Sequence, residues 1–352
     1  MKRLLAGFCL AMFMSGVVSA DTIRLSRHDF YPRQEDDYYF RAFPDIGIVD
    51  DLLFGVENFG HKVLMFSIRD GIELIKEIGR EGQGPGEFRL PISISVWNDE
   101  IAIKDEHGFS FLDTDGNFKS RFVLPSYGSG SLFLYAHGKI YAVNQRIDDA
   151  HLLDIYTLDG KMLSNVGSKY LEIDTSRYQG FGPYGIGRAV YEGDLSSEND
   201  IICYVNYKFG DVRKMNLSGE LLLAKNICDH FGEHGKETFR FNKDTFIDNG
   251  VKLAETNRFV PASKVISDAC LLSGVLYLLE SDFTPGVKRR KTEIRIVALD
   301  VETFELEAQY VFAKREEDRV FSFAVSEFQG KPIFYVHMET EDYIIAEYRI
   351  EE

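Results

Sequence analysis

A tight hairpin turn that recurs along the chain constrains the fold most. Four copies place a glycine between two β-rich runs, and a fifth does without it. They are Asp70-Gly71, Asp115-Gly116, Asp159-Gly160, Ser218-Gly219 and the segment 300–303. Glycine suits such turns because compact hairpins need positive φ angles, which other residues adopt at a cost. The turns start 45, 44, 59 and 82 residues apart. That spacing is near the length of a four-stranded propeller blade, with insertions in the later copies.

A second hairpin precedes each of these turns and also occurs once more near the C-terminus. The six copies are "IGIVDDLLFGV", "ISISVWNDEIAI", "LFLYAHGKIYAV", "AVYEGDLSSENDIICYV", "ACLLSGVLYLL" and "FAVSEFQGKPIFYV". Their runs are rich in Phe, Tyr, Ile and Val, which favour strands, and helical periodicity is scarce. The sequence therefore predicts an all-β chain, a six-bladed β-propeller made of four-stranded antiparallel blades.

The sixth copy is one strand short, because only "YIIAEYRI" (343–350) remains before the chain stops. We expect "TIRLS" (22–26), at the other end of the chain, to complete this last blade. Pairing the two chain ends removes an exposed sheet edge, which is a general hazard for β proteins. Residues 21–352 then form a single domain, with insertions at about residues 229–264 and 281–293.

The first twenty residues have the plan of a cleaved export signal. A basic start at Lys2 and Arg3 is followed by an apolar run and by small residues up to Ala20. Cys9 follows the bulky Phe8, so the segment lacks a lipobox, and no apolar run is long enough for a transmembrane span. We expect a free periplasmic or secreted protein, and a monomer.

Removal of the signal takes away two basic residues, which moves the formal charge from −16 to −18. Such a surface repels phosphate backbones, so nucleic acid is not an expected partner. Three cysteines would remain: Cys203, Cys228 and Cys270. An odd number is not a full disulfide framework, although one pair among them stays open.

The segment "IGREGQGPGEF" (78–88) has two interpretations, a phosphate-binding loop or a connection between blades. Phosphate-binding loops lead from a strand into a helix, whose N-terminus receives the anion. This segment leads instead into "LPISISVWNDEIAI", which alternates like a strand. We therefore predict a crossover between the first two blades, with a related copy, "RYQGFGPYGIG" (177–187), between the third and fourth.

The crossover resembles the G-x-G-P-G-E-F pattern of NHL-repeat propellers. The matching residues are Gly82, Gly84, Pro85, Gly86, Glu87 and Phe88. "VENFGHKVLMFSIRDG" (56–71) resembles the turn and third strand of that repeat, with Gly60 where asparagine is usual and Lys62 in place of arginine. The resemblance covers about a third of the chain. It is closest to the exported six-bladed propellers (NHL-repeat-like or TolB-like) of Bacteroidota cell envelopes, and it implies their fold and compartment.

Propellers bind ligands where the loops between second and third strands meet at the channel mouth. The polar residues expected there are Glu57, Asn58, Asp105, Glu106, His107, Asn144, Gln145, Arg146, Asn206, Tyr207, Glu280, Asp282, His337 and Glu339. Such a ring suits a metal, a sugar or a peptide terminus. Loops are also polar simply because they face water.

Two short segments raise the question of a divalent metal such as calcium. "KDEHG" (104–108) joins carboxylates to a histidine, although Asp105 also occupies a turn-forming position. "HFGEH" (230–234) has a spacing for two imidazoles on one helical face, but its glycines favour an exposed insertion loop. A third segment, "KRRK" (288–291), suits an acidic partner or anionic glycan, or is a solvated hairpin tip.

Two functions from different classes follow. The first is an envelope binding or scaffold module that holds a protein, peptide or glycan at the channel mouth without catalysis. The alternative is a metal-dependent hydrolase or lyase with its ion in the channel, for which Asp105, Glu106, His107, Asn206 and His337 are the first candidates. The sequence contains no nucleophile elbow and no HExxH motif. Binding is favoured, because fold analogy is a weak warrant for chemistry.

Overall fold

A computed structural model describes most of the chain. It covers residues 21–32, 43–106, 108–123, 132–146, 148–169, 187, 190–244, 264–282 and 290–351. The export signal predicted for residues 1–20, the candidate His107, nearly all of the crossover 177–187 and large parts of both insertions lie outside these residues. Among the residues covered, no helix is long and apolar enough to cross a membrane.

Four antiparallel sheets contain four strands each, in sequence order. The first is β2 (Asp45–Val49), β3 (Leu52–Glu57), β4 (Lys62–Ser67) and β5 (Glu73–Ile78). The second is β6 (Ser93–Trp97), β7 (Glu100–Asp105), β8 (Gly108–Asp113) and β9 (Phe118–Val123). The third is β10 (Phe133–Ala136), β11 (Lys139–Val143), β12 (Leu153–Thr157) and β13 (Met162–Val166). The fourth is β14 (Gly193–Glu198), β15 (Ile201–Asn206), β16 (Asp211–Asn216) and β17 (Leu221–Asn226).

The predicted glycine turns join the third and fourth strands of these sheets. The glycines all have positive φ: 118° at Gly71, 74° at Gly116, 81° at Gly160 and 79° at Gly219. Beside each turn the strand register shifts by one residue, as in a hairpin with a bulge. The prediction of recurring hairpins, made from local sequence, is confirmed for all four.

A fifth sheet has eight strands, in the order β18-β19-β20-β21-β1-β24-β23-β22. Its strands are β18 (Ile266–Leu272), β19 (Val275–Glu280), β20 (Glu293–Asp300), β21 (Leu306–Ala313), β22 (Arg319–Phe328), β23 (Lys331–Glu339), β24 (Tyr343–Ile350) and β1 (Thr22–Tyr31). The expectation of six separate four-stranded sheets therefore differs from the observed pairing. The cause is β1, which pairs on both of its edges.

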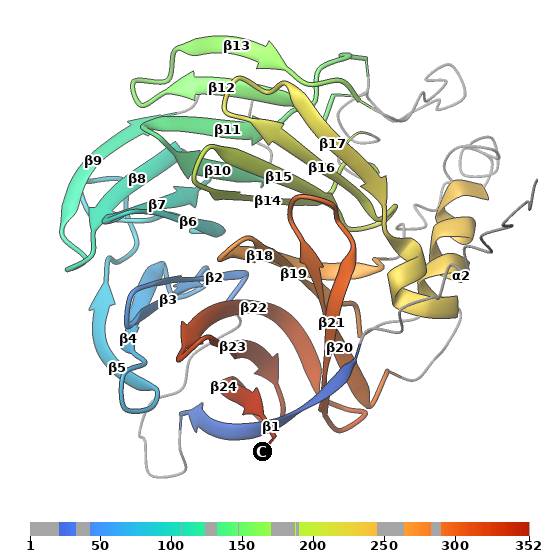
Figure 1. The fold of residues 1–352 in the computed structure, drawn as a ribbon. Coiled ribbons are helices and arrows are strands. Elements are labelled where there is room, and N and C mark those ends of the chain that lie inside the picture. The colour runs from blue at the N-terminus through green and yellow to red at the C-terminus, as the bar shows by residue number, and fades with distance from the viewer. Residues whose placement is uncertain are drawn as a thin grey trace, which may run out of the picture.

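The N-terminal strand closes the molecule, as predicted, but it is longer than the expected "TIRLS". Leu25 to Tyr31 pairs antiparallel with β24, from Ile350 to Ile345. The first three residues, Thr22 to Arg24, pair instead with β21, and in parallel. Figure 1 shows β1 running between the last strands of the chain. One strand thus joins the end of the chain to the sheet before it.

Six inner strands surround the centre of the molecule: β2, β6, β10, β14, β18 and β22. Each contacts the next, and β22 contacts β2, so the order is closed. Figure 1 shows the sheets extending outward from this centre. Their faces pack through apolar residues, such as Tyr141, Tyr204 and Phe209 between the third and fourth sheets. The fold is an all-β propeller-like fold.

The glycine-rich segment 78–88 connects β5 to β6, which agrees with the crossover prediction. Glu87 organises it: its Oε2 accepts the Gly84 N–H at 2.9 Å, and its Oε1 accepts from Arg80 Nε at 2.9 Å. A Cβ at Gly82 would lie 2.1 Å from Glu87 Oε2, so a larger residue there would displace the carboxylate that organises the loop. Phe88 is fully buried beyond the loop.

Helix α2 (Gly232–Lys243), preceded by the 3-10 helix η2 (Cys228–Phe231), corrects the prediction of an exposed loop at "HFGEH". The glycines permit the helix to pack closely, since a Cβ at Gly235 would lie 2.3 Å from the Cys228 carbonyl oxygen. Asn242 Nδ2 donates to the Lys208 carbonyl at 2.7 Å and ties the helix to the fourth sheet.

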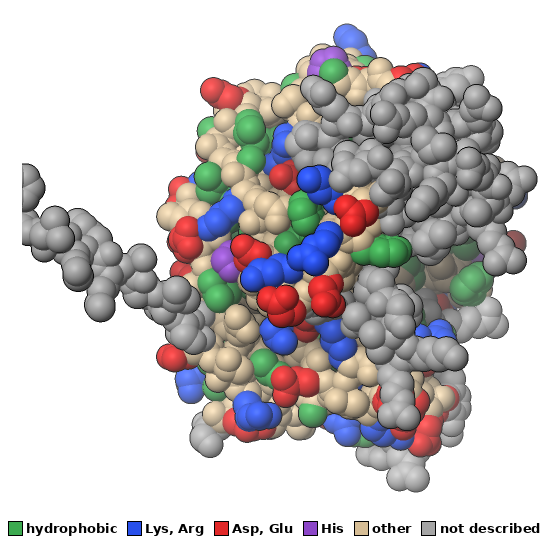
Figure 2. Space-filling model, turned by 90° about the vertical axis from the view of Figure 1, so that its right-hand side faces the viewer, with side chains coloured by type: hydrophobic (Ala, Val, Ile, Leu, Met, Phe, Trp, Pro, Cys, Tyr) green, Lys and Arg blue, Asp and Glu red, His purple; other side chains and the backbone are tan. Residues whose placement is uncertain are grey.

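Cys203, Cys228 and Cys270 are free thiols, so the disulfide that the sequence left open is absent from this structure. Acidic and basic side chains intermix on the face in Figure 2. Lys214 Nζ lies 2.5 Å from Glu302 Oε2, and Lys225 Nζ lies 2.6 Å from Glu305 Oε1. These two pairs join the fourth sheet to the β20–β21 turn.

The closure by β1 predicts the effect of truncating Leu25, which is 5% exposed in the apolar cluster of the eight-stranded sheet. Leu25→Ala should lower the free energy of unfolding by about 2–4 kcal/mol, because it leaves a cavity in that cluster. Urea denaturation measures the change. Ser26→Ala, at the exposed neighbouring position, is the control and should change little. Equal stability of the two variants would contradict closure by β1.

Candidate functional site

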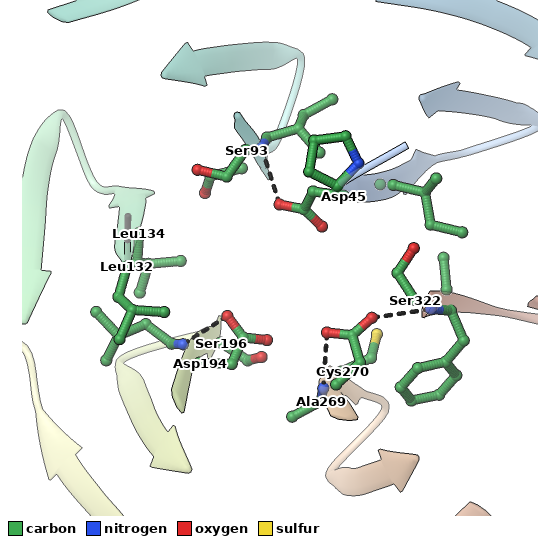
Figure 3. Close-up of a pocket in the computed structure, with 18 of the residues that line it drawn as sticks. Asp45, Ser93, Leu132, Leu134, Asp194, Ser196, Ala269, Cys270 and Ser322 are labelled. Atoms are coloured by element: carbon green, nitrogen blue, oxygen red, sulfur yellow. Dashed lines mark hydrogen bonds between the residues drawn. The ribbon is translucent and has the colours of Figure 1, made fainter. Parts of the chain in front are cut away.

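A cavity of about 600 Å³ lies at the centre of the molecule, and all six inner strands line it. Most of the lining comes from the first halves of these strands and the residues just before them. The wall is mixed, with carboxylates and hydroxyls from some strands and aliphatic side chains from others. Figure 3 shows Asp45, Asp194 and Ser322 on separate walls, with Leu132 and Leu134 on another.

Three aspartates of this cavity occupy one repeated position. Each hairpin that begins with an inner strand has a turn residue with positive φ directly after that strand. The repeated position is five residues before that turn residue. In five of the six inner strands, the pairs are Asp45 and Asp50, Ser93 and Asn98, Leu132 and His137, Asp194 and Asn199, and Asp268 and Ser273. The sequence interpretation missed these aspartates because it looked for site residues in loops. The regular spacing from the turns is a signal that would have found them.

The side chains near this position bind the neighbouring inner strand. Asp45 Oδ2 accepts the Ile94 N–H of β6 at 2.9 Å, and Asp268 Oδ2 accepts the Phe323 N–H of β22 at 2.8 Å. Between β6 and β10 a serine makes the equivalent hydrogen bond: Ser95 Oγ accepts the Tyr135 N–H at 2.9 Å. Backbone donors on inner strands have no ladder partner in the next sheet, so side-chain acceptors satisfy them.

All three aspartates are harder to ionise than usual. Burial and then repulsion from Asp268 raise the pKa of Asp45 well above its ordinary value. Burial followed by repulsion from Asp268 and Asp45 does the same to the pKa of Asp194. Burial also raises the pKa of Asp268 to about 6, although three hydrogen bonds oppose the shift. The cavity therefore holds carboxyl groups whose negative charge is costly.

The lysine Lys264 also lines the cavity, but its ammonium group forms an ion pair with Glu192. Lys264 Nζ lies 2.7 Å from Glu192 Oε1, and Lys208 Nζ lies 2.7 Å from Glu192 Oε2. Burial opposes the ionisation of Glu192, but the two lysines outweigh it and lower its pKa to about 2. Tyr207 lies under Lys264, whose Nζ is 5.1 Å from the ring centroid, and donates its hydroxyl to Asp268 Oδ1 at 3.2 Å.

Of the candidates predicted from sequence and described in the structure, Tyr207 is the one that lines this cavity. Asn144 and Arg146 line a separate hollow beside β12 and β13. His107 lies outside the described residues, and Glu106 is paired with Arg89 at 3.3 Å on the surface.

The other candidates bind neighbouring parts of the protein. Asp105 is buried and pairs with Arg121 at 2.6 Å, Glu57 is buried 3.6 Å from Lys62, and Asn58 begins the turn after β3. Asn206 is fully buried and accepts the backbone N–H groups of Lys208 and Phe209. His337 is fully buried within β23, where burial lowers its pKa to about 3. These contacts give each residue a structural role, and ligand binding by them stays a prediction.

The basic segment 288–291 is partly described, and its described residues are paired. Lys291 Nζ lies 2.7 Å from Glu280 Oε1, and Arg290 Nη1 lies 3.1 Å from Asp282 Oδ2. Two predicted site residues, Glu280 and Asp282, therefore anchor this segment through ion pairs. Within the described residues, no group of three or more His, Cys, Asp or Glu side chains could hold a metal ion.

Comparison with known proteins supports the fold. The sequence matches no family model, and no curated protein matches it. Among solved structures, a Bacteroides fragilis protein described as a "putative exported protein" aligns over 94% of this chain and 99% of its own, with a TM-score of 0.54 and 12% identity. A streptogramin B lyase aligns over 93% of this chain and 97% of its own, at a TM-score of 0.49 and 11% identity. Likeness at this identity extends to the propeller fold, and the resemblance to NHL-repeat or Bacteroidota propellers stays a prediction.

The half-buried carboxyl groups of the cavity predict how stability changes with pH. Asp has an ordinary pKa of about 3.9 in the unfolded chain, and the folded value of Asp268 is about 6. A raised folded pKa means that the folded state binds more protons. The contribution of Asp268 to stability is therefore complete below about pH 4, and it is lost as pH rises through about 6.

Asp194→Asn should raise the Tm at pH 8 by about 2 °C or more, because it removes one repelling charge while an amide oxygen can still accept the Leu195 N–H. The gain should shrink toward pH 4, where the wild-type carboxyls are protonated. Thermal denaturation across this range measures it, with Glu307→Gln, which changes an exposed side chain of β21, as the control. A gain at pH 4 as large as that at pH 8 would contradict the assignment.

Proposed function

We propose that this protein is an exported binding module, a single six-bladed propeller over residues 21–352, whose ligand enters the central cavity. The ligand class is a protein, peptide or glycan of the cell envelope, and the compartment is the periplasm or the exterior. The export signal at residues 1–20 and the single-domain organisation are parts of this proposal, as is a monomeric state.

Two observations support six blades. The eight-stranded sheet divides at β1 into β18 to β21 and β22 to β24, and β1 supplies the fourth strand of the second group. The six inner strands contact one another in a closed order. The parallel pairing of Thr22 to Arg24 with β21 then joins two adjacent blades.

The observation that carries the binding proposal is that carboxylates accept backbone N–H groups between inner strands, although a neutral side chain is sufficient for this hydrogen bond. Ser95 connects two inner strands through a hydroxyl, in the way that Asp45 and Asp268 connect theirs through carboxylates. A carboxylate that is partly removed from water costs free energy that a serine does not. Residues that lower stability in a concave site are candidates for function. The three aspartates of the cavity therefore have a reason to be acidic that structure alone does not supply.

No observation within the described residues favours the metal-dependent hydrolase or lyase, which stays a sequence-based hypothesis. The binding proposal needs only a concave site with a few fixed polar groups, and the cavity is within the usual volume of such sites, about 300–1,000 Å³.

A blocked cavity tests the proposal. Ser196 lines the cavity, so Ser196→Trp should fill part of it, whereas Ser120→Trp places the same side chain on the exposed outer strand β9. Both variants and the wild type are screened by thermal shift and calorimetry against short peptides and envelope glycans. We expect a ligand that binds the wild type and Ser120→Trp with equal affinity. Its affinity for Ser196→Trp should be lower by at least about tenfold, a loss of about 1.4 kcal/mol in binding free energy. Unchanged binding by Ser196→Trp would contradict the proposal.

A further inference from the structure

We propose that the ligand group received by the cavity is an alkylammonium, and that Asp45, Asp194 and Asp268 receive it. Such a group is carried by a lysine side chain, a peptide N-terminus or a small free amine. The inference rests on the proposed function and names the chemistry of that same site.

The three carboxylates have no opposing charge bound to them among the described residues, where none of them forms an ion pair. Lys264, the basic residue of the lining, lies 2.7 Å from Glu192, which binds Lys208 at the same distance. Lys264 is therefore paired with a strongly ionised partner, and its remaining attraction for Asp268 leaves the pKa of that aspartate raised to about 6. A cationic ligand would bring the missing positive charge and would remove the repulsion among the aspartates.

The hydrogen-bonding capacity of the walls also suits an ammonium. An ionised carboxylate accepts hydrogen bonds and donates none. An alkylammonium is its complement, with three N–H donors and no acceptor. Ser322 adds a second, independent sign of a ligand, because its hydroxyl is buried in the lining, at 3% exposure, and has no hydrogen-bond partner in the described structure. It belongs to β22, which contacts both β18 with Asp268 and β2 with Asp45.

Another part of the lining favours carbon. Leu132 and Leu134 face the cavity from β10 and the residue before it, next to Asp194 and across from Ser322 (Figure 3). An alkyl chain attached to the ammonium can contact these leucines while its charged end lies among the carboxylates. A bare metal ion would use only the acidic side, and the described residues lack a ligand group suited to one.

Calorimetry at pH 8 with n-pentylamine, 1,5-diaminopentane, 1-pentanol, glucose and calcium chloride tests the inference. We expect the two amines to bind, with pentanol, glucose and calcium binding at least about tenfold more weakly. Asp45→Asn and Asp194→Asn should each weaken amine binding by about tenfold or more, as expected for loss of a charged hydrogen bond. Ser322→Ala should weaken it by a few fold, and Glu307→Gln, which removes an exposed charge from β21, should leave it unchanged.

A peptide with a free N-terminus, compared with its acetylated form, distinguishes a polymeric source of the ammonium from a small amine. Amine binding that is absent, equalled by pentanol, or insensitive to both Asp→Asn changes would overturn the inference. If a panel ligand is excluded by Ser196→Trp but tolerates both Asp→Asn changes, the binding function stands and the ammonium assignment fails. If every ligand tolerates Ser196→Trp, the binding function itself fails.

Discussion

The hydrogen bond from the backbone of one inner strand to a side chain of its neighbour is the interaction on which this molecule depends. Strands within each sheet satisfy one another, but the inner strands of different sheets meet without a ladder. Asp45, Ser95 and Asp268 each accept an N–H from the next inner strand and so connect the inner strands around the centre. The same residues determine what the cavity contains.

This connection has an electrostatic cost that varies around the ring. A serine makes it without charge, whereas the aspartates introduce groups that repel one another and resist ionisation. The aliphatic Leu132, directly before β10, is at the equivalent position. The cavity is thus asymmetric, acidic on three strands and apolar on another, and this asymmetry arises from single residues at one repeated position of an otherwise regular fold.

Much of the fold follows from local sequence. Glycine after Asp or Ser predicts the tight turns because those positions need positive φ. The count of strands predicts that the N-terminus completes the last sheet. The double pairing of β1 was not predicted, because nothing in Thr22 to Arg24 indicates that they pair with β21 and not with β24. Helix α2 was also missed, because its glycines, unfavourable for an isolated helix, are needed for packing against Cys228.

The candidate site was less predictable than the fold. Loop position suggested Asp105 and Glu280, but burial beside Arg121 and Lys291 could not be read from the sequence. The cavity aspartates lie in short strands whose alternation alone does not distinguish a residue facing the channel from one facing water, and only their constant spacing from the following turns does so. The most direct test of the account is a carbon-13 NMR titration of the carboxyl groups of Asp45, Asp194 and Asp268. The account predicts that all three titrate well above the ordinary value of about 3.9, and titration of all three near that value would contradict it.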